Sequence, residues 1–411
     1  MRVAPAFALA LCLLHGAPAP ARAQPAQWAP CQGGEGITRR QAIDACTSII
    51  TAAGQPLAFR AVVYATRGRH HYLGGDYDRA VADLDVAARL DPKFAPAFHY
   101  RGLSYAAKND LDRAIADFDR VIALDPGFAS AHFRRGLAYY NRGDLDRAIA
   151  DFDRAIALDA TSDLTFHYRG LAYSKKGEPA RAIADFDQAI RLDPTNALAF
   201  YNRANSYAAK GDRERATADY DTAIGLKAGD ARFYNKRGEL RRASGNHDLA
   251  ITDFSRAVTL DPAFAEAYLN RAASHRANGD LDAAIADYGE ALRRKPGSRA
   301  TLLDRAGAYA AKGDIDHARE DYGQAIAGLL QQVMAYPRDP QRRRQQGVAR
   351  VKFSLDRGGN VVASSIAASS GDPLLDREAL AMIQRAQPFP PPPGDKDATD
   401  FSIAIRFSLQ R

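Results

Sequence analysis

Small and bulky apolar residues recur along most of the chain with a period of 34 residues. The segments APAFHYRGLSYAAKNDLDRAIADFDRVIALDPGF (95–128) and ASAHFRRGLAYYNRGDLDRAIADFDRAIALDATS (129–162) align without a gap, and eight such copies fit between Ala61 and Gln332. Each copy has Gly or Ala at its eighth place, Ala at its twentieth and a bulky residue at its twenty-fourth. Small residues let two helices approach closely, so each copy is predicted to form a packed helix pair, A then B.

Turn signals separate the two helices of each copy. Gly stands at the fifteenth place in seven of the eight copies and is followed by an acid or Asn, as expected where one helix stops and a second is capped. Pro ends the second helix at the thirty-second place of five copies, at Pro92, Pro126, Pro194, Pro262 and Pro296. The pattern predicts a mainly α chain with an α-solenoid over residues 61–332.

These glycine, alanine, aromatic and proline places resemble the tetratricopeptide repeat (TPR) family over about two thirds of the chain. The resemblance implies a right-handed superhelix of helix pairs whose inner surface, lined by helix A, binds an extended peptide or a protein surface. The family's groove places are the second, fifth, ninth and twelfth of each copy. Carried over, the fifth gives His99, Phe133, His167, Tyr201 and Asn235, and the twelfth gives Tyr72, Tyr140, Arg242 and Arg276. The alternative for each of these aromatics is simple packing against a neighbouring helix.

Two charged places are more regular than the family pattern requires. Arg occupies the seventh place and Asp the twenty-third place of all eight copies. We expect a structural ladder of ion pairs, in which the Arg stem is buried and the guanidinium meets the carboxylate in two hydrogen bonds. The central pairs are Arg101 with Asp117, Arg135 with Asp151, Arg169 with Asp185, and Arg203 with Asp219. The alternative is a stripe of unpaired arginines that binds anions.

After Gln332 the period of 34 stops. VARVKFSLDRGGNVVASSIAASSG shows two alternating runs around the turn 356–360, which indicates a β-hairpin. DPLLDREALAMIQRAQ has helical spacing, with Asp372 and Pro373 suited to a helix start, and DFSIAIRFSL alternates again. The order strand, strand, helix, strand predicts a small α+β domain over residues 333–411.

That order resembles the C-terminal domain of the TonB family. The matching marks are Tyr336-Pro337, Gly347, Val351, Phe353, the turn 356–359, Ser369-Ser370-Gly371, Leu375-Asp376, Ala379-Leu380 and Pro388-Phe389-Pro390. The resemblance implies that Gln341 and the edge formed by Phe401, Ile403, Ile405 and Phe407 receive a short peptide of an outer-membrane transporter by strand addition. The prolines would then carry the chain from the helix to this last strand. The apolar side chains of the strand can also simply pack on the helix, while the backbone edge still binds.

The N-terminus has the features of an export signal. Met1-Arg2 is followed by an apolar stretch to Leu14 and by the small-x-small motif 21–23, which predicts a signal peptide over residues 1–23. A dozen apolar residues fall short of the roughly 20 that span a bilayer, so we expect no membrane span after cleavage. In the predicted N-terminal cap, residues 24–60, Cys31 and Cys46 are expected to form a disulfide worth about 3 kcal/mol. A redox or metal pair is the alternative, but no nearby histidine supports it.

Other chemistry finds little support. The 56 basic and 49 acidic residues are interleaved, which argues against a nucleic-acid groove. The histidines have no partner at metal or nucleophile spacing, and the glycine run 33–36 follows no strand, so we predict no catalytic residue, metal or cofactor.

Together these features predict a periplasmic adaptor or scaffold of a Gram-negative bacterium that binds proteins or extended peptides, among them segments of outer-membrane transporters. The alternatives are an energy transducer, which either retains its N-terminal segment or borrows its motive force from another protein, and an envelope enzyme. A TonB transducer is expected to have a membrane helix and a proline-rich spacer, and this chain has a signal-like start and repeats in their place.

Overall fold

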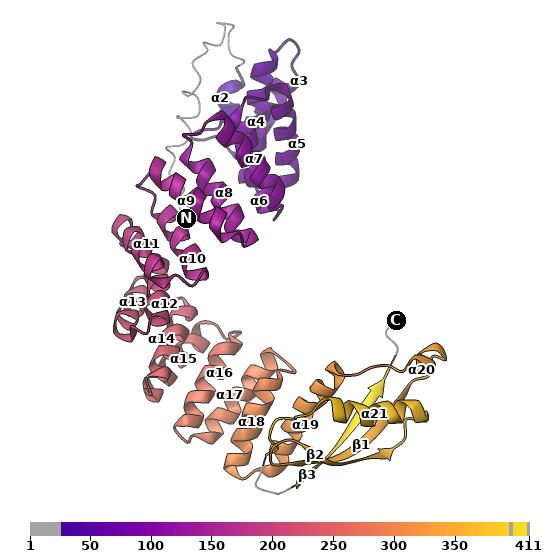
Figure 1. The fold of residues 1–411 in the computed structure, drawn as a ribbon. Helices are drawn as coiled ribbons and strands as arrows, with labels where there is room; N and C mark the ends of the chain where they lie inside the picture. The colour runs from indigo at the N-terminus through magenta and orange to yellow at the C-terminus, as the bar shows by residue number, and fades with distance from the viewer. Residues whose placement is uncertain (1–25, 394–397, 409–411) are drawn as a thin grey trace. The chain divides into compact units, whose positions relative to one another are not determined.

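The computed structural model describes residues 26–393 and 398–408, and the predicted signal peptide lies outside them. The chain forms two compact units, one up to Asp212 and one from Arg213 on. Helix pairs build the first unit, and further pairs followed by a small sheet build the second (Figure 1). In the described residues, no helix combines the length and apolar character that crossing a bilayer requires.

The first unit begins with a short capping segment. It contains α2 (Trp28–Gln32) and α3 (Arg39–Thr51). The predicted disulfide between Cys31 and Cys46 is present and ties α2 to α3, and both cysteines are buried in a cluster with Ile49 and Val63.

The repeats of the first unit follow without insertion. Helices A are α4 (Leu57–Leu73), α6 (Ala95–Ala107), α8 (Ala129–Arg142), α10 (Asp163–Lys175) and α12 (Ala197–Ala209). Helices B are α5 (Tyr77–Leu90), α7 (Leu111–Leu124), α9 (Leu145–Leu158) and α11 (Pro179–Leu192). Helix α4 starts four residues before the predicted copy, directly after Pro56.

Local sequence explains where these helices stop and start. Asp110 caps α7 by accepting a hydrogen bond from the Arg113 backbone N–H at 3.2 Å, and Asp76 and Asp144 cap α5 and α9 in the same way. The preceding turn requires a left-handed residue. Gly143 supplies it with φ 89°, and Asn109, the one exception among the eight copies, adopts φ 60°.

The second unit continues the pattern. Its helices are α13 (Arg213–Leu226), α14 (Ala231–Ala243), α15 (His247–Leu260), α16 (Ala265–Ala277), α17 (Leu281–Arg294), α18 (Arg299–Lys312) and α19 (Ile315–Gln332). Helix α19 has 18 residues, whereas α17 has 14. After α19 the chain forms α20 (Arg338–Arg342), β1 (Gly347–Asp356), β2 (Val361–Ala368), α21 (Pro373–Arg385) and β3 (Ala398–Phe407).

The three strands form an antiparallel sheet in the order β2-β1-β3. The register places Val351 opposite Ile403 and Phe353 opposite Phe401, so the apolar residues of β1 and β3 share one buried face. Helix α21 packs on β1 and β2, and its first turn is capped by the Asp372 carboxylate, which accepts from the Leu374 N–H at 2.7 Å.

The sheet domain packs directly on the last repeat. Tyr322, Ile326 and Leu330 of α19 belong to the same buried cluster as the apolar residues of β1, β3 and α21. The ring of Tyr322 lies 4.9 Å from that of Phe401, and its hydroxyl donates to the carbonyl of Pro390. In the earlier repeats, helix B packs on the next helix A, as α17 does on α18. The domain therefore covers the surface at which another repeat would stack.

The proline segment connects α21 to β3 through specific contacts. The Phe389 backbone N–H donates to the Gly359 carbonyl at 3.0 Å, and the Phe389 ring stacks 5.7 Å from that of Phe353. A Cβ at Gly359, where φ is 82°, would come within 1.9 Å of the Phe389 carbonyl oxygen. The hairpin turn therefore needs glycine because the proline segment passes against it.

Helices A and B approach each other at matched places. At the eighth place of four copies, an added Cβ would lie 2.7 to 2.9 Å from the ring of the phenylalanine at the twenty-fourth place, as in Gly102 with Phe118 and Gly238 with Phe254. Where the eighth place is Ala, the twenty-fourth is Tyr, as in Ala272 with Tyr288 and Ala306 with Tyr322. Glycine thus accompanies the phenylalanine in this close helix contact.

This contact can be tested with Gly170→Ala. The new methyl group would lie 2.8 Å from the Phe186 ring, so we expect the free energy of unfolding to fall by about 1–3 kcal/mol in chemical denaturation. Gly323→Ala in α19 is the matched control because nothing lies within 4 Å of its added Cβ, and helix propensity should make it neutral or stabilising by up to about 1 kcal/mol. Equal effects of the two substitutions would contradict the close contact.

Candidate functional site

The arginine at the seventh place is a three-point clamp. Arg101 donates from Nε and Nη2 to the two carboxylate oxygens of Asp117, at 2.9 and 2.6 Å. Its Nη1 donates to Asp85 on the preceding helix B at 2.7 Å. One guanidinium thus connects the helices B of two successive repeats.

The same geometry recurs along the repeats. Nη1 donates to the preceding helix B from Arg135 to Asp119, from Arg169 to Asp153, from Arg203 to Asp187 and from Arg237 to Asp221, at 2.5 to 2.6 Å. The sequence analysis missed these acceptors, although an Asp at the twenty-fifth place of five successive copies was a visible signal. The last copies lose it: Arg271 meets the Ser255 hydroxyl at 3.1 Å, and Gly289 stands opposite Arg305.

Burial makes these pairs structural. The Asp117 and Asp185 side chains are each 6% exposed, and burial raises the pKa of both carboxyl groups. The hydrogen bonds that Arg101 donates to Asp117 raise the pKa of Arg101, and those that Arg135 donates to Asp151 raise the pKa of Arg135. These arginines are paired, so they do not form a free anion-binding stripe.

Aromatic rings line helix A of the first unit. Tyr72 contacts Tyr100 at 6.1 Å, and the same pair recurs two repeats later as Tyr140 with Tyr168 at 6.3 Å. Phe133 also lies 5.9 Å from Tyr168, and these rings are half-buried. The sixth place, which holds Tyr100 and Tyr168, was not among the predicted groove places. The recurrence of Tyr there was the signal that could have revealed it.

Two predicted groove residues have little surface to offer. His167 is 7% exposed and Asn235 is 1% exposed, because the fifth place also faces the neighbouring helix. Asn235 donates to the Glu239 carboxylate at 2.7 Å. We therefore leave both residues out of the groove surface, whereas Phe133, Tyr201, Tyr72 and Tyr140 remain half-buried at its face.

His99 and His167 occupy apolar surroundings. Each ring has a buried Nδ1 that finds no hydrogen-bond partner in the part of the chain that the structure describes, and burial lowers the pKa of each to about 4. His99 lies edge-on to the Phe128 ring at 5.3 Å, and His167 lies 5.6 Å from Phe186. Both imidazoles are neutral at pH 7 and act as packing groups.

In the second unit, the predicted groove residues lie among mixed charges. Arg276 is exposed and approaches Asp304 at 3.6 Å. Arg242 is half-buried, and within residues 26–393 and 398–408 its Nε has no hydrogen-bond partner. Lys236 pairs with Glu239 at 2.7 Å, so acids and bases alternate on this surface.

The predicted peptide edge is β3. Its apolar side chains point into the core, with exposures of 6% for Phe401, 8% for Ile403, 5% for Ile405 and 1% for Phe407. The packing alternative thus holds for these four side chains, which belong to the same buried cluster as residues of α19 and α21, while the alternating Ser402, Ala404 and Arg406 are exposed. Binding of a peptide along the backbone edge stays a prediction. Among the described strands, β3 pairs with β1 alone, so its outer backbone edge has no strand partner. Gln341 is exposed on α20.

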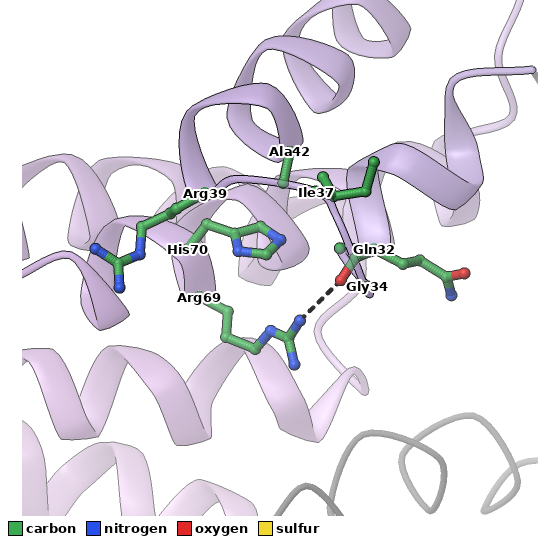
Figure 2. Close-up of a pocket in the computed structure, with 8 residues that line it drawn as sticks. Gln32, Gly34, Ile37, Arg39, Ala42, Arg69 and His70 are labelled. Atoms are coloured by element: carbon green, nitrogen blue, oxygen red, sulfur yellow. Dashed lines mark hydrogen bonds between the residues drawn. The ribbon is translucent and has the colours of Figure 1, made fainter.

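A pocket of about 320 Å³ lies between the capping segment and α4 (Figure 2). Arg69 reaches across it and donates to the Gln32 carbonyl at 3.1 Å, and the His70 ring bonds the Cys31 carbonyl at 2.9 Å. Burial lowers the pKa of His70. Arg39 also lines the pocket, which contains no carboxylate or thiol that could act on a substrate. The contacts close the cap on the first helix A.

Comparison with known families agrees with this architecture. The model described as "Gram-negative bacterial TonB protein C-terminal" matches residues 332–409. Models described as "Tetratricopeptide repeat" and "TPR repeat" match residues 101–163, 175–211, 201–263, 235–299 and 269–337. The chain carries tetratricopeptide repeats and a TonB C-terminal domain.

Individual proteins cover parts of the chain. Protein TonB of Pseudomonas putida is 44% identical over 64 residues, which are 16% of this chain and 26% of that protein, so the chain spans about a quarter of this curated relative. A solved TPR protein from Parabacteroides merdae is 16% identical with a TM-score of 0.48, covering 63% of this chain and 98% of that one. MamA is 25% identical with a TM-score of 0.38, covering 39% and 94%.

The clamp predicts unequal roles for its two carboxylates. Asp185→Ala should lower the free energy of unfolding by roughly 3 kcal/mol, because it leaves the Arg169 guanidinium without its buried partner. Asp153→Ala removes a partner of the same guanidinium whose side chain is 52% exposed, so the cost should stay below about 1 kcal/mol. Denaturation of both variants checks this. Negligible effects of both would contradict the buried clamp.

The buried histidines predict acid sensitivity of the TPR array. Their folded pKa of about 4 lies below the ordinary 6.5, so the unfolded chain takes up protons first and stability is lost as pH falls from 6.5 toward 4. Each histidine should lower the free energy of unfolding by about 2 kcal/mol between pH 7 and pH 5. Urea denaturation at the two pH values should show this loss reduced in His99→Gln and His167→Gln. An unchanged loss would show that the rings are already solvated.

Proposed function

We propose that this protein is an interaction adaptor of the Gram-negative cell envelope. Its TPR groove holds one partner, and its TonB domain binds a peptide by strand addition along β3. TPR and TonB modules both support a protein-interaction scaffold, and both are typically non-catalytic. The observation that carries the proposal is the unpaired outer edge of β3 in a domain that matches the TonB C-terminal model.

The β3 edge suits an added strand. Only one of its sides pairs with β1 over the ten residues from Gly347 to Asp356. Its inward side chains lie in the core shared with α19 and α21, so the strand is already ordered before a partner binds. An incoming peptide would gain main-chain hydrogen bonds from this edge, and its alternate side chains would lie beside Ser402, Ala404 and Arg406.

The TPR helices provide the second binding surface. Rings at the sixth and twelfth places of the first unit pair between successive helices A and remain half-buried, so each still presents part of its face to a partner. Aromatic side chains contribute large contact areas with few rotatable bonds, which suits binding of an extended segment.

The periplasm is the proposed location. The signal-like residues 1–23, the disulfide between Cys31 and Cys46, and the TonB domain all fit an exported protein of the envelope.

A TonB-type energy transducer is the second candidate, favoured by the 44% identity to Protein TonB within the C-terminal region. It requires an anchored N-terminus, whereas the adaptor requires a cleaved one. Intact mass of the protein from its own membrane and soluble fractions separates them. A membrane-bound species that retains Met1 favours the transducer, and a soluble species that starts at Gln24 with the disulfide formed favours the adaptor.

Strand addition can be tested with N-methylated peptides. We expect the full chain to bind N-terminal segments of outer-membrane transporters. In an edge complex only every second peptide N–H group points at β3. One peptide therefore carries methyl groups on its odd-numbered nitrogens and a second peptide on its even-numbered nitrogens. We expect one of the two to lose binding and the other to bind nearly as well as the unmethylated peptide. Isothermal titration with both peptides measures the difference.

The comparison needs the full chain because the TonB domain shares its core with the last repeat. The unmethylated peptide is the positive control, and a peptide with scrambled sequence tests the role of its side chains. An equal loss of affinity in the odd-methylated and even-methylated peptides would point to side-chain docking and would exclude strand addition at β3. Absence of binding by every transporter segment would count against the TonB-domain half of the adaptor.

A further inference from the structure

Helix A of the first unit presents a face with charge of one sign. At 100° per residue, the second, fifth, sixth, ninth, twelfth and thirteenth places of each copy fall within about 120° of one another. In the first five copies these places contain no Asp or Glu, and their charged residues are Arg69, Arg134 and Lys175. In the last three copies the same places include Glu239, Glu266 and Asp304. A face whose charged residues all have the same sign is therefore confined to the first unit, because the last three copies mix these acids with Arg232, Lys236, Arg242 and Arg276.

Arg134 differs from its neighbours in having no carboxylate partner. It is exposed, its guanidinium lies 5.5 Å from the Phe133 ring centre, and no ion pair or hydrogen bond joins it to another described residue. The adjacent Arg135 is fully engaged with Asp151 and Asp119. In a solenoid where the seventh-place arginines pair with acids, Arg134 keeps its hydrogen-bonding capacity for something else.

Lys175 repeats this arrangement. Its Nζ lies 5.2 Å from the ring centre of Tyr140, it is exposed, and it too has no acidic partner among the described residues. Arg69 is different because its guanidinium is bonded to the Gln32 carbonyl. Two cations of the face thus have no acidic partner among the residues described, and each lies over an aromatic ring.

The aromatic pairs flank Arg134 on both sides. Tyr100 occupies the same place as Arg134 on the preceding helix A, and Tyr168 occupies it on the next one. Tyr72 and Tyr140 are the ring partners of these two tyrosines. Burial raises the pKa of Tyr72 and lowers that of His99, and the positive charge of Arg134 acts on both groups, so this cation lies close to the first pair. Phe133 connects the second pair through its contact with Tyr168 at 5.9 Å. The small Ala106 takes the twelfth place between the pairs.

We infer that this face of the first unit binds an extended peptide in which an acidic side chain is flanked on each side by an apolar one. The inference rests on the proposed function and specifies the partner of its TPR groove. The carboxylate pairs with Arg134, and the apolar side chains lie on the two tyrosine pairs. Packed helices are about 10 Å apart, so the pairs are about 20 Å apart. An extended chain covers that span in about six residues, with the acid near the middle.

The experiment starts from a phage library of random 12-residue peptides selected on the immobilised full chain. Selected peptides are synthesised with a fluorescent label, and their affinities are measured by anisotropy for the parent chain and for Tyr168→Ala, Arg134→Gln and Lys175→Gln. Arg154→Gln on α9 is the matched control, because Arg154 is also exposed and without an ion-pair partner among the described residues but belongs to helix B.

Peptides weakened by Tyr168→Ala occupy the groove, and we expect these to contain Asp or Glu with apolar residues about three positions to either side. Arg134→Gln should weaken them about tenfold, and Glu→Gln in the peptide should do the same without adding to the effect of Arg134→Gln. Arg154→Gln should leave their affinity unchanged. Lys175→Gln should give a smaller loss.

The contrary outcomes are distinct. Groove-bound peptides that lack an acid, or that bind Arg134→Gln as tightly as the parent, overturn this inference and leave the TPR half of the proposed function standing. A selection in which no peptide responds to Tyr168→Ala overturns that half of the proposed function and this inference with it. If Arg134→Gln and Arg154→Gln lower the peptide affinity equally, the effect comes from the net charge of the protein. That result also overturns the inference.

Discussion

The repeats depend on a half-buried guanidinium that meets carboxylates from two helices. A charge removed from water is tolerated only when its donors are satisfied. Arg101 satisfies three of them, two through Asp117 and one through Asp85 on the preceding repeat. Because one side chain serves both the helix pair and its neighbour, repetition of the same residues holds successive helix pairs in the same register. The opposite face of helix A carries half-buried rings that these ion pairs do not use.

Sequence reasoning predicted the parts that depend on local rules. Helix boundaries follow caps and left-handed turn residues such as Gly143, and the Cys31–Cys46 pair has few alternatives. It missed what depends on neighbours in space. Within its own repeat, Asp85 resembles an ordinary surface acid, and its role is visible only in its contact with Arg101 of the next repeat. His167 occupies a groove place by count, yet an adjacent helix covers it. Alternation in β3 predicted an apolar face, but whether that face met a partner or α19 required the packed structure.

The two candidate surfaces recognise different properties of a partner. A strand edge recognises backbone, because its hydrogen bonds form with any sequence that can extend. A face of rings and unpaired cations recognises side chains, because carboxylate and apolar groups must fall at the right spacing. A protein with both kinds of surface can bind one partner with low sequence specificity and another with high sequence specificity. That combination suits a scaffold better than a catalyst, whose residues would have to converge on one reacting atom.

The packing of the TonB domain on α19 has a consequence for how the array comes apart. A linear stack of repeats in which each repeat contacts only its neighbours normally unfolds first at its less stable end. The clamp is weakest in the last copies, where Ser255 and Gly289 replace the second carboxylate, and that is where Tyr322 and Ile326 enter the core of the sheet. At the opposite terminus a covalent bridge ties the first helices together. Because both ends of the array are stabilised in this way, we expect local unfolding to begin at interior helix pairs. An interior pair that unfolds loses its packing against two neighbouring pairs.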